Sequence, residues 1–408
     1  MDHSLQWKDG SVTDLGALKG INGSFPEWIN DRGMVAGFSE NSRIDPLTGF
    51  PEYRAVLWDH GRIRNLGTLG GNVSADDAIN NRGQVAGTAL NTVPDSFASS
   101  LFAGYLYFLF PVATQAHAFL WDMRDGMRDL GTLGGPDSIA LFVNEQSQAA
   151  GISFTSSMPN SNNGPACIPN VPTQDPFLWK NGRMIDLGTL GGHCGWPFSL
   201  NDRGEVVGDS TPLGDGYSLP FLWTKTSGMR ALPLLGQEFT GEAFGINDTG
   251  QAVGFGATSP RAFALLWERG KAKYLGDLPG ANCTIAFSIN SHGQIAGFSG
   301  VGSQGCSGRA VLWDNGPPMD MNLLVPRNSR LYMYEAISIN ERAEVIGNGS
   351  LPNGDVHAFL AIPCDENHPR IEGCDYRPVQ AYALSSRSRR PPTIQRQTRF
   401  LFHLGWHG

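Results

Sequence analysis

The chain has 408 residues, of which 40% are hydrophobic, 17% are charged and 52 are glycine, a composition that suits short strands joined by tight turns and excludes a mainly helical protein. Its net charge is −8. Residues 376–408 carry six arginines and no acid, so residues 1–375 carry 24 basic and 38 acidic side chains, or −14, which excludes a nucleic-acid-binding body.

The amino terminus, MDHSLQWKDG, has no charged segment followed by an apolar one, so it contains no signal peptide. Residues 3–7, HSLQW, align with HAFLW at residues 117–121, which means that a repeat has already begun. We therefore expect either a truncated chain or a misplaced start.

One segment recurs seven times and is clearest as AFGINDTGQAVGFG, residues 243–256. It contains an aliphatic residue, then an asparagine, and a glycine seven positions after the asparagine. The asparagines are Asn30, Asn80, Asn144, Asn201, Asn247, Asn290 and Asn340, and the glycines are Gly37, Gly87, Gly151, Gly208, Gly254, Gly297 and Gly347. Their spacing of 43 to 64 residues indicates an array of like supersecondary units.

A second recurring element, HAFLWDMRDGMRDLGTLGG at residues 117–135, lies between successive copies of the first. Seven of the ten tryptophans occupy one position of it. They are Trp7, Trp58, Trp121, Trp179, Trp223, Trp267 and Trp313. A large aromatic side chain fixed to one position of a repeat is typical of a packing anchor.

Each unit contains four short apolar runs separated by turn residues, which in the second unit are residues 55–58, 63–66, 76–79 and 84–88. Asn and Gly between them supply the positive φ angles of tight hairpins. We therefore predict four-stranded antiparallel units. Because units of this size pack radially in propellers, the predicted fold is an all-β, seven-bladed β-propeller rather than a parallel β-helix or another β-array.

Small residues recur four positions before the repeat asparagine, as at Ala140, Ala243, Ala286 and Ala336. This predicts that the strand containing them is the innermost one, where blades crowd the axis. Two hairpins lack the expected glycine, at residues 144–147 and 340–343, and we expect both to form looser turns.

Two long insertions interrupt the pattern, at residues 90–115 and 153–175. The first contains FASSLFAGYLYFLFPVA, residues 97–113, which at 17 uncharged residues is at the lower limit for a membrane span. The repeat continues in register on both sides of it, so we expect no transmembrane span. A loop or short helix folded onto the domain is expected instead. The functional interpretation of the same segment is a patch that binds a partner.

Six cysteines fall in three neighbouring pairs: Cys167 and Cys194, Cys283 and Cys306, and Cys364 and Cys374. Neighbour pairing is the simplest of the 15 possible connectivities. The sequence has no CxxC and no accompanying histidine spacing, so disulfides in an oxidising compartment are favoured over a zinc site.

The repeats end near Cys364, which divides the chain into a repeat domain, residues 1–364, and an Arg-, Pro- and Ser-rich tail, residues 365–408. The tail is expected to be mostly disordered. The seventh repeat supplies three strands from residues 336–360, and we predict that residues 12–15 add the fourth. The closing blade would then be shared by both chain ends.

The linked motifs HAFLW, DLGTLGG and INDRGxVVG make the chain resemble the bacterial HAF-repeat family over residues 3–362. The family takes its name from the triplet found here at residues 117–119 and 357–359. Its members are described as extracellular repeat proteins, so the resemblance implies export. It brings no activity, cofactor or catalytic residue.

Recognised catalytic and ligand-binding motifs are absent from suitable contexts. The glycine-rich GTLGG at residues 67–71 precedes a strand and therefore lacks the helix N-terminus that binds phosphate. The Asn-Asp-x-Gly hairpin has one acid at most, whereas a calcium loop needs six to eight oxygen ligands. We expect no metal and no cofactor.

The acids expected nearest the axis are the weak binding candidates Glu27, Asp76, Asp77, Glu242 and Glu335. Paired carboxylates can perform acid and base chemistry on a glycoside, although a wet channel also tolerates acids that have no catalytic role. His117 and His357 stand at strand starts and are expected to be edge residues with hydrogen-bond partners.

Together these observations predict a monomeric, secreted or cell-surface module that binds an unknown extracellular protein or glycan and has no catalytic activity. The alternative is a polysaccharide-active enzyme, a glycoside hydrolase or lyase, that uses channel acids.

Overall fold

A computed structural model describes residues 3–8, 11–18, 23–95, 97, 112–164, 166–236, 238–302, 306–325, 329–365, 368, 374 and 402–404. The chain forms two compact units, residues 1–258 with 266–273 and residues 259–265 with 274–408, and the division falls within the fifth repeat. No α-helix occurs among the described residues, and the strands form several multi-stranded sheets. The all-β prediction is confirmed.

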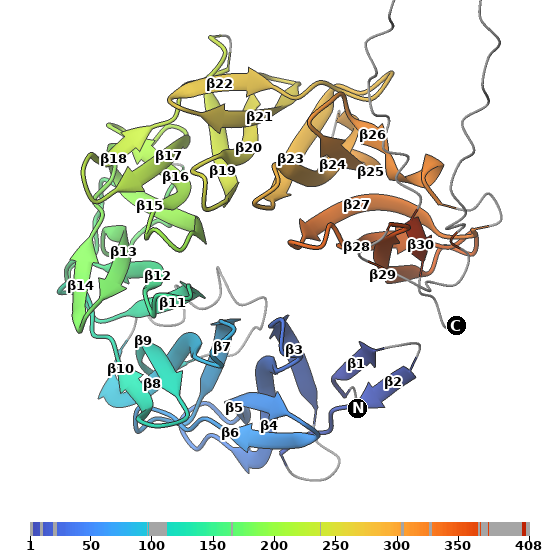
Figure 1. Ribbon diagram of the computed structural model, residues 1–408. Helices are drawn as coiled ribbons and strands as arrows, with labels where there is room; N and C mark the ends of the chain where they lie inside the picture. The colour runs from blue at the N-terminus through green and yellow to red at the C-terminus, as the bar shows by residue number, and fades with distance from the viewer. Residues whose placement is uncertain are drawn as a thin grey trace, which may run out of the picture. The chain divides into compact units, whose positions relative to one another are not determined.

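In the first unit a short hairpin is followed by the strands of four repeats (Figure 1), and the strands of the third and fourth repeats are joined into one eight-stranded sheet. The strands are β1 (Leu5–Lys8) and β2 (Ser11–Asp14); β3 (Ser24–Ile29), β4 (Val35–Ile44), β5 (Pro51–Asp59) and β6 (Arg62–Asn65); β7 (Ser74–Ile79), β8 (Val85–Pro94), β9 (Thr114–Asp122) and β10 (Gly126–Asp129); β11 (Ser138–Val143), β12 (Ala149–Phe154), β13 (Gln174–Lys180) and β14 (Arg183–Asp186); β15 (Gly191–Leu200), β16 (Val206–Pro212), β17 (Leu219–Thr224) and β18 (Gly228–Ala231). Within each repeat the strands follow sequence order and pair antiparallel, as predicted, whereas the links from β13 to β15 and from β21 to β23 are short parallel pairings between repeats.

The fifth repeat comprises β19 (Thr240–Ile246), β20 (Ala252–Ala257), β21 (Ala262–Glu268) and β22 (Lys271–Tyr274). The second unit continues with β23 (Cys283–Ile289), β24 (Gln294–Gly302), β25 (Cys306–Asp314) and β26 (Met319–Asp320), followed by the 3₁₀ helix η1 (Met321–Leu323). The seventh repeat supplies β27 (Tyr332–Ile339), β28 (Val345–Ser350) and β29 (Val356–Pro363), and β30 (Phe402–Leu404) pairs with β29.

The recurring glycine is explained by a bulge in the first strand of every repeat. At each bulge one residue of the first strand has no partner, and the register shifts around it. A Cβ on the facing glycine would lie well under 3.0 Å from a carbonyl oxygen of the bulged strand, for example that of Ile139 opposite Gly151. Only glycine permits this approach, so the bulge requires the glycine that faces it.

The repeat asparagine connects neighbouring repeats as well as closing its own turn. Asn80 Oδ1 accepts hydrogen bonds from the N–H groups of Arg82 and Gln84, while its Nδ2 donates to the carbonyl of Asn144 in the next repeat. The same link joins Asn30 to Asn80, Asn144 to Asn201 and Asn201 to Asn247 in the first unit, and Asn290 to Asn340 in the second, at 2.9 to 3.1 Å. We call this set the asparagine ladder.

The residue after each asparagine adds a parallel set of links. Its N–H donates to the side chain at the same position of the next repeat, as from Glu145 to Asp202 and from Asp202 to Asp248, at 2.8 Å. The acid of Asn-Asp-x-Gly is therefore a hydrogen-bond acceptor between hairpins, which agrees with rejecting a calcium loop.

The two hairpins without glycine form the same turn as the others, so the prediction of looser turns was wrong. Ser147 and Ala343 take φ of 56° and 60°, close to the 76° of Gly33, and each donates its N–H to the repeat asparagine's carbonyl. The two ladders on either side hold the turn in place and offset the cost of a left-handed conformation in a residue with a Cβ.

The phased tryptophans pack between repeats, as predicted. All are buried except Trp7 in the terminal hairpin. Trp58 packs against Leu15 and Leu18, and its indole N–H donates to the carbonyl of Gly16 at 3.3 Å. The equivalent bonds from Trp267 to Pro233 and from Trp313 to Leu275 measure 2.7 and 3.0 Å.

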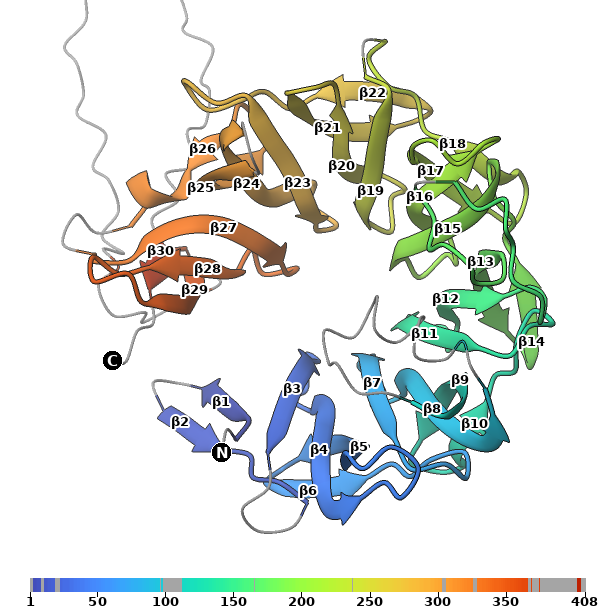
Figure 2. The same ribbon diagram turned by 180° about the vertical axis from the view of Figure 1, so that it is seen from behind.

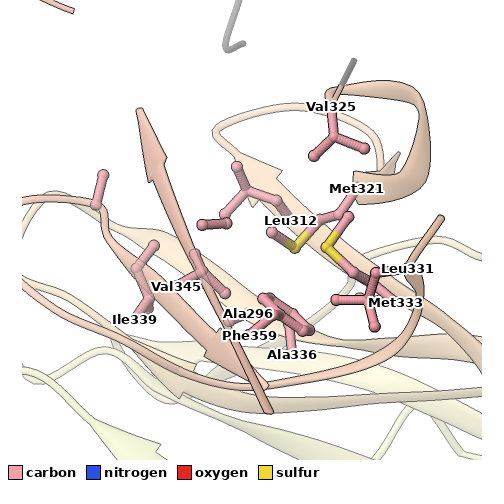
Figure 3. Packing of buried hydrophobic residues seen from close by; sticks show 13 residues of the cluster. Ala296, Leu312, Met321, Val325, Leu331, Met333, Ala336, Ile339, Val345 and Phe359 are labelled. Carbon is pink, nitrogen blue, oxygen red and sulfur yellow. The ribbon is translucent and has the colours of Figure 1, made fainter. Parts of the chain in front are cut away.

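The junction between the sixth and seventh repeats shows how the sheets pack (Figure 3). Side chains of β24 and β25, such as Ala296 and Leu312, meet Ile339, Val345 and Phe359 from β27, β28 and β29. Burial is complete or nearly so. Apolar residues from two consecutive repeats thus form one core cluster, so no single sheet carries its own core.

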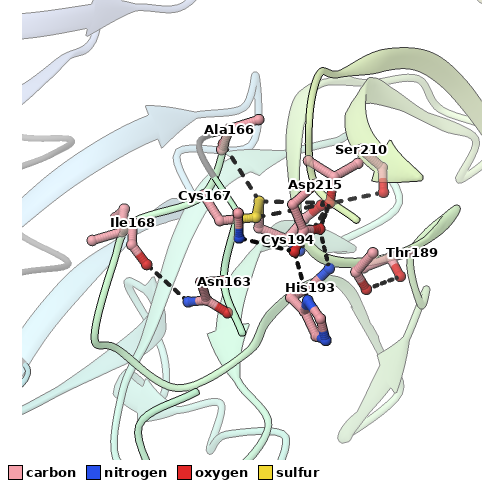
Figure 4. The surroundings of a disulfide bond; sticks show 12 residues. Asn163, Ala166, Cys167, Ile168, Thr189, His193, Cys194, Ser210 and Asp215 are labelled. Atoms are coloured by element: carbon pink, nitrogen blue, oxygen red, sulfur yellow. Dashed lines mark hydrogen bonds and ion pairs between the residues drawn. A yellow bond between two sulfur atoms is a disulfide. The ribbon is translucent and has the colours of Figure 1, made fainter. Parts of the chain in front are cut away.

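Two predicted disulfides are present. Cys167 pairs with Cys194, and Cys364 pairs with Cys374. Cys283 is also disulfide-bonded; the side chain of its predicted partner, Cys306, lies outside the described residues. The first disulfide ties the 153–175 insertion to β15 beside Asp215 and His193 (Figure 4).

At the chain ends, β2 pairs with β1 in the terminal hairpin of the first unit, and β30 from the tail pairs with β29 in the second unit. The closing blade shared by residues 12–15 and 336–360 would join the two units and stays a prediction. Of the remaining tail, His368 is buried beside Asp365, while residues 375–401 lie outside the described residues.

Both ends of the apolar insertion pack on the domain. Phe97 contacts Phe154 edge to face, and Val112 joins Leu90 and Ala116 in a buried cluster. Residues 98–111 lie outside the described residues. Among the described residues, no helix is long and apolar enough to cross a membrane.

Candidate functional site

The bulge places one residue of each first strand outside the ladder of paired residues. In the first unit β3, β7, β11, β15 and β19 follow one another along one side (Figure 2). Their bulge residues are Glu27, Asp77, Leu141, Phe198 and Phe244, which we call the bulge row. In the second unit the same position holds Phe287 and Ile337.

The bulge row varies where the positions around it do not. The position just before it holds alanine or proline in six repeats and Asp76 in the other. The asparagine three positions after it never changes. The neighbours of the bulge row are therefore nearly constant, while the row itself differs from repeat to repeat. Leu141 is the buried member of the row and packs with Ile152 and Val171 in a core cluster.

Three of the predicted acids come together between the first two repeats. Glu27 and Asp77 occupy the same bulge position on β3 and β7, and Asp76 adjoins Asp77; we call these three the β3–β7 acid group. Asp76 is 1% exposed, Asp77 is half-buried and Glu27 is open to solvent. Within the described part of the chain, neither carboxyl oxygen of Asp76, nor Oδ2 of Asp77, has a hydrogen-bond partner in another residue.

The acid group is held in an unfavourable electrostatic setting. Burial, followed by the charges of Asp77 and Glu27, raises the pKa of Asp76 well above its usual range. Burial and the charge of Glu27 do the same for the pKa of Asp77. Burial also raises the pKa of Glu27, whose carboxyl is desolvated by the neighbouring chain although its side chain is open to solvent. No described Lys or Arg forms an ion pair with any of the three.

A second pair of acids lies between the fourth and fifth repeats. Burial, together with the charge of Asp209, raises the pKa of Glu242 to about 7, and burial raises the pKa of Asp209 to about 6. Phe255 is the cross-strand partner of Glu242. Its ring stacks on Phe244, which also contacts Phe198, with centroids 5.8 and 5.2 Å apart. Glu242 thus shares β19 with Phe244, while Asp209 lies on β16, next to the strand β15 that carries Phe198.

Glu335, the fifth predicted acid, belongs to the second unit and is described by itself. Asn348, its cross-strand partner on β28, donates a hydrogen bond to Oε2 at 3.4 Å. The structure therefore brings together Glu27, Asp76 and Asp77 as one group and pairs Glu242 with an acid that was not predicted.

Sequence reasoning did not single out Asp209, although a signal was present. It stands eight residues after Asn201, where no other repeat carries an acid; the others hold Phe38, Thr88, Ile152, Phe255, Phe298 and Asn348. An acid at a position that is otherwise apolar or neutral breaks the repeat pattern without a structural reason.

The predicted edge histidines serve local structure. His117 Nδ1 lies 2.9 Å from Asp129 on the neighbouring strand, and this pairing raises the pKa of His117 against the opposing effect of burial. His3 and Asp14 repeat the arrangement in the terminal hairpin. His357 lies on β29 opposite Gly349. Among the residues that the structure describes, no three His, Cys, Asp or Glu side chains are arranged to hold a metal ion.

We expect the free energy of unfolding to fall as the pH rises from 5 to 8. Burial raises the pKa of Asp137, Asp175 and Glu242 to about 7 each. Such a group stabilises the fold fully below its unfolded pKa, about 4, and the contribution is lost as the pH rises through about 7. Melting temperatures across this range check the sign, and Asp137→Asn should flatten the slope. A melting temperature that increases toward pH 8 would contradict the prediction.

No protein-family model and no curated protein matches the chain. Among solved structures, a gluconolactonase from Xanthomonas campestris is similar over 60% of this chain and 78% of its own, with 10% identity and a TM-score of 0.30. The tricorn protease is similar over 89% of this chain, with 11% identity and a TM-score of 0.28. The matched part spans 40% of the tricorn chain. Likenesses this weak carry no argument about this protein.

Proposed function

We propose that the seven repeats close into a seven-bladed β-propeller of four-stranded blades. The support comes from one interface that recurs between repeats. The aliphatic residue before the asparagine packs against the residue six positions after the asparagine of the preceding repeat. The pairs are Ile79 with Ala36, Val143 with Ala86, Leu200 with Ala150, and Ile339 with Ala296.

The first and last repeats each leave half of this interface uncovered. Ile29, before the first asparagine, is 58% exposed, and Ile346, six residues after the last asparagine, is 50% exposed. In all other repeats the residue at the position of Ile346 is fully buried. The two exposed faces are complementary by position, and ring closure buries both.

Crosslinking tests the closure. In the double variant Ile29→Cys/Ile346→Cys, oxidation should give a crosslinked monomer that migrates differently from the reduced chain. Ile29→Cys with Leu213→Cys, an exposed residue after β16, is the matched control and should not crosslink. Covalent oligomers from the first variant would show that the end faces pack between copies, and the absence of any crosslink would contradict closure.

We further propose that the protein is an exported, non-catalytic binding module for an extracellular protein or glycan. Export is supported by the disulfides, because such bonds persist in oxidising compartments. Peptide mapping without reduction tests it on protein purified from its native compartment. Free thiols at the paired cysteine positions would contradict the extracellular assignment.

The observation that carries the binding role is the bulge row. This position recurs along one side of consecutive repeats and is occupied by acids in the first two and by half-buried phenylalanines in the fourth and fifth, while Leu141 of the third is buried. Variable side chains that repeat in this way are suited to recognition. The remaining recurring residues are accounted for by turns, ladders and packing.

A glycan array and an extracellular protein panel, probed with the folded chain, test the proposal. Each hit is measured again with Phe198→Ala/Phe244→Ala and with Ile185→Ala, a matched control on the outer strand β14. Affinity should fall at least about tenfold in the first variant only, after folding is verified from its melting curve. Ligands that bind both variants equally would place recognition elsewhere and contradict the role of the bulge row.

The second candidate is a polysaccharide-active enzyme, favoured by the Asp209–Glu242 pair. A general acid works best when its pKa is near the working pH, and burial raises the pKa of Glu242 to about 7. Hydrolysis or lysis of a polysaccharide panel that disappears in Glu242→Gln, while folding is kept, would establish this candidate and overturn the non-catalytic proposal.

A further inference from the structure

We propose that the β3–β7 acid group binds a primary ammonium group carried by the ligand, such as a lysine side chain or an amino sugar. This inference rests on the proposed binding function and names the chemistry of one end of the bulge row.

The three acids differ in exposure. Asp76 is buried, and its carboxyl oxygens have no hydrogen-bond partner in another residue among those that the structure describes. Asp77 is half-buried, and Glu27, at the same position of the adjacent first strand, faces solvent. A buried carboxyl group with no partner costs free energy that a bound hydrogen-bonding group removes.

The acids are not demanded by the fold. The position of Asp76 holds alanine, fully buried, in the third, fifth, sixth and seventh repeats. The position of Asp77 holds Leu141, Phe198 and Phe244 in the next three repeats. Two adjacent acids at positions that accept apolar residues elsewhere lower stability, and groups retained at such a cost are candidates for function.

The charge balance selects a cation. The three carboxyl groups repel one another, and no described Lys or Arg pairs with them. A primary ammonium is compact and has three donors and no acceptor, so it suits carboxyl groups arriving from two strands better than the planar guanidinium fork does.

Calorimetric titration of the full chain with 1,5-diaminopentane tests the inference. The diamine should bind at low ionic strength, and 1,5-pentanediol and tetramethylammonium should not. Asp77→Asn should weaken binding at least about tenfold, because a charge-assisted hydrogen bond is lost. Glu268→Gln, which removes an exposed acid at the end of the third strand β21, is the matched control and should bind normally.

Asp76→Ala separates binding from folding. It removes an unpartnered buried carboxyl group and restores the residue of four other repeats, so the melting temperature should rise while diamine affinity falls. Loss of binding in a more stable variant cannot arise from unfolding.

Three results would overturn the inference: no diamine binding to the unmodified chain, equal weakening by Asp77→Asn and Glu268→Gln, or equal binding of tetramethylammonium. If the panels yield a ligand that needs Phe198 and Phe244 but no amine, the proposed function stands and this inference fails. If the diamine binds at the acid group, while every panel ligand binds equally well to the bulge-row variants, this inference stands and the proposed role of the bulge row fails.

Discussion

Replacing Gly151 or Gly208 by alanine is expected to destabilise the domain by more than about 3 kcal/mol, measured as the change in free energy of unfolding in urea. A Cβ at position 151 would overlap the backbone carbonyl oxygen of Ile139 on the opposite, bulged strand, and a Cβ at position 208 would overlap that of Trp196. A backbone carbonyl cannot move away by changing rotamer, as a flexible side chain can. The bulge must therefore open, and the hydrogen bonds between the first and second strands of the repeat are lost with it.

Gly216→Ala is the matched control, because a Cβ there meets nothing within 4 Å. It should change stability by less than about 0.5 kcal/mol. If all three variants unfold at the same urea concentration, the glycine would not be a steric requirement of the bulge, and the explanation of the most regular feature of the repeat would be wrong.

Trp313→Ala is expected to cost about 3 to 5 kcal/mol, the range of large-to-small changes in a core. The indole is 1% exposed, and its N–H donates to the carbonyl of Leu275 at 3.0 Å. The substitution leaves a cavity and an unsatisfied carbonyl at the same place. Trp313→Phe should recover most of the packing and lose about 1 kcal/mol for the hydrogen bond.

Trp7→Ala tests the same repeat position where it is not enclosed. Trp7 is 38% exposed in the terminal hairpin, so its removal should cost less than about 1 kcal/mol. Full thermal stability of Trp313→Ala would mean that the phased tryptophans are available to ligands, and stacking on a sugar ring would then become the better explanation of their spacing.

The recurrence of residue types predicted a large part of the fold. The spacing of Asn30, Asn80 and their equivalents gave the number of repeats, and the turn residues gave four strands in a unit. The burial of Trp58 and the pairing of Cys167 with Cys194 were predicted because a repeated position, or a pair of neighbouring cysteines, has few physical alternatives.

The second role of the same residues was not predictable in this way. A single repeat shows Asn80 closing a turn, but its bond to Asn144 exists only when two hairpins are stacked. The ladder also explains why Ser147 and Ala343 keep a turn that their own conformational preferences oppose. Local propensity is outweighed here by hydrogen bonds supplied from neighbouring repeats.

For the candidate site too, the sequence identified some features and only the structure showed the others. The sequence identified Glu27, Asp76, Asp77 and Glu242 because acids are conspicuous on strands expected to be innermost. It did not reveal that the bulge brings Glu27 and Asp77 to equivalent positions, that Asp76 lacks any donor, or that Asp209 accompanies Glu242.

The sequence by itself determined the all-β class, the seven repeats, the packing role of tryptophan and two cysteine pairs, because each is written into short segments whose periodicity is visible without neighbours. Only the tertiary structure decided the bulge, the asparagine ladder, the grouping of acids and the pairing of the chain ends. The ladder and the grouping of acids depend on contacts between residues about 50 positions or more apart, such as Asn80 and Asn144, and such contacts are set by how repeats stack rather than by any local preference. The bulge joins strands of one hairpin, but its close approach shows only once the two strands are paired.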